Sequence, residues 1–94
     1  MYHVYILYSP SLDRHYIGQT ESVSERLRFH SAHATPFTAQ AADWLVVFVE
    51  PVGTRQEAMA LERRIKRAKN RSSLARYIRD PRNTVKIQMP IADG

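Results

Sequence analysis

The feature of the sequence that most constrains the fold is a continuous apolar run near the middle of the chain, Trp44-Leu45-Val46-Val47-Phe48-Val49. A loop-like stretch, residues 39–43, precedes this run, and Pro51-Val52-Gly53 interrupts the chain soon after it. A short apolar run between such breaks is typical of a strand that is buried on both faces. We therefore expect residues 44–50 to form a strand at the centre of the core.

Two more strands are expected at the start of the chain, over residues 2–8 and 15–19. Residues 9–13 between them include the Pro, Ser and Asp residues that form hairpin loops. Tyr5 would lie in the first strand and Tyr16 in the second. Directly opposed side chains of an antiparallel pair stand about 5 Å apart, so two phenols placed there could address one ligand group. Tyrosine is also a common strand residue, and both rings could simply pack against the core.

Three helices are expected, over residues 20–34, 54–70 and 72–79. Near the start of each of the first two, Ser or Thr is followed three positions later by Glu, which is a capping box. Residues 81–94 contain two prolines and a terminal glycine and are expected to form an irregular C-terminal tail. The second helix carries apolar residues at helical spacing, which predicts a face packed on the sheet: Ala58, Leu61, Ile65 and Ala68.

The composition fits one small cytoplasmic domain. The chain has 94 residues, which is below the usual size for two domains. No apolar run approaches the ~20 residues that a membrane helix needs, and Met1 leads directly into a strand-like segment, so we expect no membrane association and no signal peptide. The absence of cysteine excludes disulfides, zinc–thiolate sites and thiol nucleophiles, and it fits a reducing cytoplasm.

Positive charge is concentrated in one segment of the chain. Nine of the fourteen Lys and Arg residues lie between Arg63 and Arg82, where Asp80 is the only acidic residue. Nucleic acid is the commonest partner for such a block, because neutralised phosphates release counterions. A solvated helix face is the alternative interpretation. The residues expected to grip a nucleic-acid backbone are Arg63, Arg64, Lys66, Arg67, Lys69 and Arg71.

Three further side chains could carry chemistry. Arg26 and His30 are four positions apart, so they would project from one face of the first helix. Glu62 lies at the border of the apolar stripe of the second helix, where a carboxylate is usually salt-bridged, here to Lys66. A solvated arginine and a histidine that binds helix-end carbonyls are the simpler interpretations of the first two.

These groups together match the needs of phosphodiester hydrolysis. The reaction requires a base to activate water, a cation to neutralise charge on the phosphoryl oxygens, and help for the leaving oxygen. Arginine offers a forked donor to those oxygens, and a single carboxylate can hold a Mg²⁺ ion that keeps several waters. A tyrosine base, with an ordinary pKa of about 10, would need a neighbouring cation or metal-bound water.

The order of these residues resembles the GIY-YIG endonuclease superfamily, and specifically the small single-domain branch similar to the N-terminal nuclease domain of the excision-repair subunit UvrC. The first signature is matched by His3-Val4-Tyr5, with histidine in place of the usual glycine, and the second by Tyr16-Ile17-Gly18. The helix signature fits Arg26 and His30, and the metal-binding glutamate fits Glu62.

The resemblance implies an α+β fold in which a three-stranded antiparallel β-sheet is flanked by helices, over residues 1–80. It implies that Tyr5, Tyr16 and the other signature residues meet in one site that uses Mg²⁺ or Mn²⁺ and cuts nucleic acid, with DNA preferred to RNA as the expected substrate. Tyr16 is then the general base assisted by Tyr5, although the sequence leaves the choice between the two phenols open. Gly18 is expected to serve a structural turn.

One departure concerns the loop over residues 31–38, which lacks the glycines and the tyrosine that are usual in this branch. It leaves the preferred substrate shape open and makes His33 an extra possible contact. We expect an endonuclease acting on structured or damaged DNA in repair, with a possible protein partner that supplies specificity. A nucleic-acid-binding module that keeps the fold with weak or no catalysis is the alternative.

Overall fold

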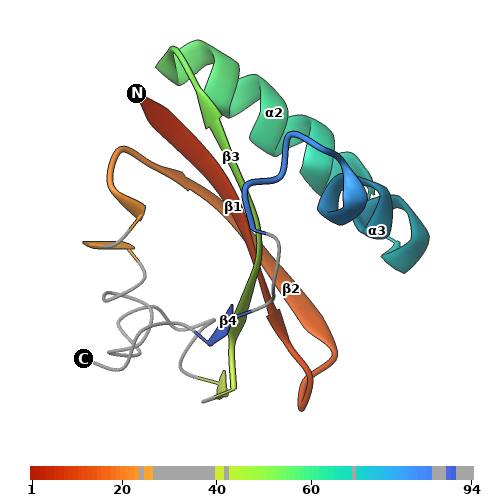
Figure 1. Cartoon of the computed structure of the whole chain (residues 1–94). Helices are drawn as coiled ribbons and strands as arrows, with labels where there is room; N and C mark the ends of the chain where they lie inside the picture. Colours follow the sequence, from red (N-terminus) through yellow and green to blue (C-terminus); the bar gives the residue numbers. More distant parts are fainter. Residues whose placement is uncertain (24, 27–39, 42, 69, 86–88, 91–94) are drawn as a thin grey trace.

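The computed structural model describes residues 1–23, 25–26, 40–41, 43–68, 70–85 and 89–90. Its antiparallel sheet has the strand order β2-β1-β3-β4 (Figure 1). The predicted α+β fold with three antiparallel strands and flanking helices is confirmed, with the two-residue β4 added beside β3. The elements are β1 (Tyr2–Ser9), β2 (Arg14–Thr20), β3 (Leu45–Val52), α2 (Arg55–Ala68), α3 (Arg71–Arg79) and β4 (Met89–Pro90).

The first two strands form the predicted hairpin. Their register pairs Tyr5 with Gly18 and Leu7 with Tyr16. Asp13 closes the turn with a φ of 52°, in the left-handed region that aspartate tolerates better than most residues. The hydroxyl of Tyr8 donates a 2.8 Å hydrogen bond to the Asp13 carboxylate, which ties the turn back to β1.

Helices α2 and α3 lie together on one side of the sheet (Figure 1). Their apolar residues pack on Val4, Ile6 and Phe48 of the sheet: Ala58, Leu61, Ile65 and Leu74. The predicted Thr54–Glu57 pair caps the start of α2, since the Glu57 amide donates to Thr54 Oγ1 at 3.1 Å and that hydroxyl donates to Glu57 Oε1 at 3.2 Å. The helix signal of the sequence therefore agrees with the structure at the cap and along the buried face.

The opposite face of the sheet carries a second apolar cluster formed by Tyr5, Leu7, Trp44, Val46 and Val49. Strand β3 contributes to both clusters, and its residues from Val46 to Val49 are all buried. The prediction of a central strand buried on both faces is confirmed. Because both faces are covered, β1 and β3 provide a rigid base for side chains that emerge near β2.

A buried asparagine attaches the chain after α3 to the sheet. Asn83 Oδ1 accepts from the amides of Val49 and Val85, both at 3.0 Å, while its Nδ2 donates to the carbonyls of Val47 and Ile78 at 3.0 and 2.8 Å. The backbone amide of Thr84 also donates to the Val49 carbonyl. The division into residues 1–80 and a tail over 81–94 stays a prediction, and this anchored segment lies beyond that boundary.

Candidate active site

Two tyrosine rings lie side by side on the face of the sheet opposite α2. Because Tyr5 pairs with Gly18 and Tyr16 pairs with Leu7, the two tyrosines are diagonal neighbours rather than directly opposed. Their ring centroids are 6.3 Å apart with an interplanar angle of 28°. The sequence predicted that the two phenols lie next to each other. The strand register also shows that the residue directly opposite Tyr5 is Gly18, which has no side chain.

The glycine opposite Tyr5 makes room for its phenol. A Cβ atom on Gly18 would lie 2.6 Å from the Tyr5 hydroxyl oxygen and 2.8 Å from its Cζ, closer than non-bonded atoms approach. Gly18 lies inside β2 and not at a turn, which differs from the structural turn expected from the sequence. Its backbone has no positive φ, so the missing side chain, and not conformational freedom, is what this position requires.

Arg26 contacts the tyrosine pair from the segment that follows β2. Val23, Glu25 and Arg26 are helical, and the Arg26 amide donates to the Ser22 carbonyl at 3.1 Å. The Arg26 Nε donates a 3.3 Å hydrogen bond to the Tyr5 hydroxyl. That bond raises the pKa of the Arg26 guanidinium, with further contributions from Tyr16. The Arg26 guanidinium therefore interacts with the hydroxyl groups of both tyrosines.

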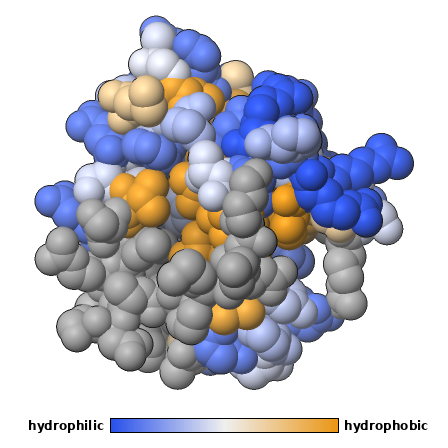
Figure 2. Space-filling model, viewed as in Figure 1, coloured by the Kyte–Doolittle hydropathy of each residue, from blue (hydrophilic) through white to orange (hydrophobic). Residues whose placement is uncertain are grey.

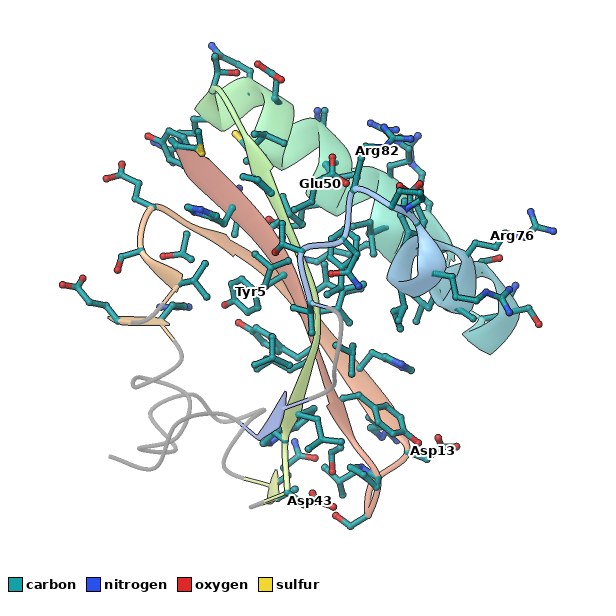
Figure 3. All side chains as sticks on the ribbon, in the orientation of Figure 1. Tyr5, Asp13, Asp43, Glu50, Arg76 and Arg82 are labelled. Carbon is teal, nitrogen blue, oxygen red and sulfur yellow. The ribbon has the colours of Figure 1, made fainter. Side chains whose placement is uncertain are left out.

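Tyr5 is held as a neutral phenol. The residue is only 1% exposed, and burial raises its pKa to about 12. Burial outweighs the lowering effect of the Arg26 hydrogen bond, and the nearby Tyr16 and Glu62 add smaller upward contributions. Its oxygen accepts a hydrogen bond from Arg26, and a phenol that keeps its proton is also a hydrogen-bond donor. Tyr16 is partly exposed, so of the two phenols it is the one that solvent reaches. Figure 3 shows Tyr5 on the face of the sheet away from α2.

Glu62, the predicted metal ligand, lies on α2. Its side chain is 18% exposed, and its Oε2 lies 2.7 Å from Lys66 Nζ, which is the expected ion pair one turn along the helix. Its charge is near enough to Tyr5 to add to the raised pKa of that phenol. Among the described residues, no three His, Asp or Glu side chains form a metal-binding cluster. A lone, hard carboxylate oxygen nevertheless suits Mg²⁺, which keeps several waters and takes its remaining ligands from phosphate.

The other predicted site residues divide between described and undescribed parts of the chain. Arg63, Arg64, Lys66 and Arg67 are exposed on α2, and Arg71 begins α3. His30, His33 and Lys69 lie outside the described residues. Asn70, which is not among these predicted residues, caps α3, where its Oδ1 accepts from the Ser73 amide at 2.8 Å.

Comparison with known families agrees with this geometry. Residues 1–77 match the family model described as the GIY-YIG catalytic domain. The match covers more than half of the chain, so the protein belongs to the GIY-YIG family, which is a family of endonucleases. Searches of curated proteins and of solved structures gave no match. None of the described helices combines the length and apolar character needed to cross a membrane.

Proposed function

We propose that this protein is a divalent-metal-dependent endonuclease that hydrolyses phosphodiester bonds in structured or damaged DNA. The observation that carries the proposal is the contact between Arg26 and the two tyrosines, beside the carboxylate of Glu62. A cation in contact with two phenols, with a carboxylate whose charge acts on one of them, offers the groups that a phosphoryl-transfer site needs.

Each side chain then has one task. Arg26 binds the nonbridging oxygens of the scissile phosphate and stabilises the charge that develops on them, since a guanidinium matches phosphate oxygens with two donors. Tyr16, as its phenolate, takes the proton from the attacking water while the water oxygen bonds to phosphorus and the bond from phosphorus to the leaving oxygen breaks. It is the partly exposed phenol, and the Arg26 guanidinium lies next to it. Tyr5, buried and protonated, orients that water or a phosphate oxygen by donating its proton in a hydrogen bond.

Glu62 would hold Mg²⁺ or Mn²⁺, and the bound ion would polarise a phosphoryl oxygen. Lys66 already forms an ion pair with this carboxylate, so a metal ion must displace the lysine ammonium from Glu62 Oε2 in order to bind there. His30 orients the tyrosine or assists proton transfer, as the family resemblance implies.

The substrate assignment rests on charge and resemblance. The exposed basic residues of α2 would grip backbone phosphates of the bound DNA: Arg63, Arg64, Lys66 and Arg67, with Lys69 and Arg71 after them. DNA is proposed ahead of RNA, with a role in repair similar to that of the UvrC branch and a cytoplasmic location. A partner protein would add specificity that a domain of this size lacks.

A second candidate function is a nucleic-acid-binding module with weak or no catalysis. The ion pair between Glu62 and Lys66 favours it, because a carboxylate that stays paired with lysine does not bind metal. Salt-dependent DNA binding without cutting at any Mg²⁺ or Mn²⁺ concentration is the result that this candidate predicts.

The test is to incubate purified protein with branched and nicked DNA in Mg²⁺, in Mn²⁺ and in EDTA. Cleavage is expected only with metal, and Glu62→Ala is expected to abolish it. Glu57→Ala is the matched control, since it removes a carboxylate from the same helix at the exposed capping box. Cleavage that survives Glu62→Ala unchanged contradicts the assignment.

A further inference from the structure

Two of the basic residues of α2, Arg64 and Arg67, line a groove between α2 and α3 together with Arg76 of α3. The groove has a volume of about 390 Å³, and the residues around it that bear on its chemistry are Arg64, Arg67, Ser73, Arg76, Tyr77 and Asp80. Figure 2 shows hydrophilic side chains gathered over these two helices, on the right of the molecule. Three guanidiniums around one hollow suggest a ligand with several negative charges.

Among the described residues, no acidic side chain forms an ion pair with the guanidiniums of this groove. Within the described part of the chain, Arg64, Arg67 and Arg76 make no ion pair. The carboxylate in the groove, Asp80, is already bound by Arg82, whose amide donates to it at 2.8 Å and whose Nε lies 3.2 Å from Oδ1. The groove therefore keeps its positive charge.

Stabilisation of helix ends does not account for all of this charge. Arg67 and Arg76 lie in the last turns of α2 and α3, where a cation interacts favourably with the helix dipole. Arg64 lies before the last turn of α2, so it gains little from that effect. The ring of Tyr77 is fixed by an edge-on contact with Phe48, with centroids 6.3 Å apart, so this wall of the groove is built on the core.

The groove and the candidate active site lie on different sides of α2. Residues 62 and 64 project about 160° apart on an α-helix. Glu62 and Lys66 lie on the flank whose charge reaches Tyr5, and Arg64 and Arg67 lie on the flank that faces α3. Figure 3 shows Arg76 on the helix side of the sheet and Tyr5 on the other side. A single straight segment of backbone cannot contact both flanks of one helix.

We infer that the α2–α3 groove is a second phosphate-binding site, which holds the backbone of a second DNA segment while the scissile segment lies at the tyrosines. The inference rests on the proposed nuclease function and names its substrate class. The preferred substrate is DNA that presents backbone on both sides of α2, which means branched or sharply bent DNA. A straight duplex would use one flank only.

The experiment compares a three-way junction with a straight duplex of equal total length, both fluorescent, by anisotropy in EDTA at several salt concentrations. The wild type is expected to bind the junction more tightly. In the double variant Arg64→Gln/Arg76→Gln, the plot of log affinity against log salt concentration is expected to become less steep. The magnitude of its slope should decrease by about 2 for the junction and by less for the duplex. Arg79→Gln is the matched control for Arg76→Gln, because it removes the same charge from the last turn of α3 but does not line the groove.

Equal affinity of the wild type for both probes, or equal effects of Arg76→Gln and Arg79→Gln on junction binding, overturns the inference. Tight binding of a polyglutamate peptide that depends on Arg76 but does not compete with the junction would assign the groove to an acidic protein and also overturn it. Cleavage assays run in parallel separate the two proposals. A junction preference without cleavage supports the groove and contradicts the nuclease, whereas cleavage without a junction preference does the reverse.

Discussion

The Nε of Arg26 donates a 3.3 Å hydrogen bond to the hydroxyl oxygen of Tyr5, joining the helical segment after β2 to the central strand β1. Tyr5 is buried and cannot turn away, so this contact fixes the position of the guanidinium beside the tyrosine pair. A guanidinium held in advance can stabilise charge on a phosphate without the cost of ordering it during the reaction.

Replacing Arg26 by lysine keeps the charge but removes the planar fork. We expect Arg26→Lys to lower the cleavage rate about 100-fold or more, because ammonium cannot bond Tyr5 and phosphate in the same geometry. Single-turnover kinetics at saturating DNA measure the effect. Arg14→Lys, at an exposed position of β2, is the control and should leave the rate nearly unchanged. Equal rates for the two variants would remove Arg26 from the mechanism.

A side chain at Gly18 is expected to displace Tyr5. The added Cβ of Gly18→Ala meets the phenol at 2.6 Å, and the phenol is enclosed by the core, so we expect a loss of about 1–3 kcal/mol in the free energy of unfolding. Gly53→Ala is the matched control, since its Cβ meets only the flexible Glu57 carboxylate at 3.4 Å. Urea denaturation measures both. The account is contradicted if both variants are equally stable.

The raised pKa of Tyr5 makes stability fall at alkaline pH. The folded protein keeps this proton up to about pH 12, whereas the unfolded chain releases it near pH 10. The contribution is therefore complete below pH 10 and is lost as pH rises toward 12, by at most about 1.4 kcal/mol per pH unit. Urea denaturation across this range should show a steeper decline for the wild type than for Tyr5→Phe. Parallel declines would contradict the raised pKa.

Asn83 is expected to contribute more to stability than its place after the last helix suggests. Asn83→Ala leaves backbone groups at four positions without their partner, and we expect a loss of about 2–4 kcal/mol in the free energy of unfolding. Asn70→Ala removes one capping bond and should cost about 1 kcal/mol. Thermal or urea unfolding of both variants provides the comparison, and a smaller loss for Asn83→Ala would contradict the role of the anchor.

Much of the fold was predictable because its signals are local. The apolar run of β3, the turn residues of the β1–β2 hairpin and the Thr54–Glu57 cap of α2 each depend on neighbours within a few positions. The ion pair of Glu62 with Lys66 is of the same kind, since both residues lie on one helix face.

Relationships between distant segments were not predictable in this way. Asn83 bonds to β3 groups 34 and 36 residues away, and nothing local marks that asparagine among other polar residues. The space above Gly18 depends on the register that sets it opposite Tyr5, and the hairpin loop alone did not define that register. The separation of the basic residues into two flanks required the packing of α3 against α2.

The central claim is that Glu62 holds the metal that supports phosphodiester cleavage. The most direct test measures the single-turnover cleavage rate against Mg²⁺ concentration for the wild type and for Glu62→Gln, which keeps the size of the side chain but removes its charge. The account predicts a cleavage rate that rises with Mg²⁺ and saturates for the wild type. For Glu62→Gln it predicts a rate lower by at least about 100-fold, with DNA affinity and melting temperature retained. Identical metal dependence and rate for the two proteins would contradict it.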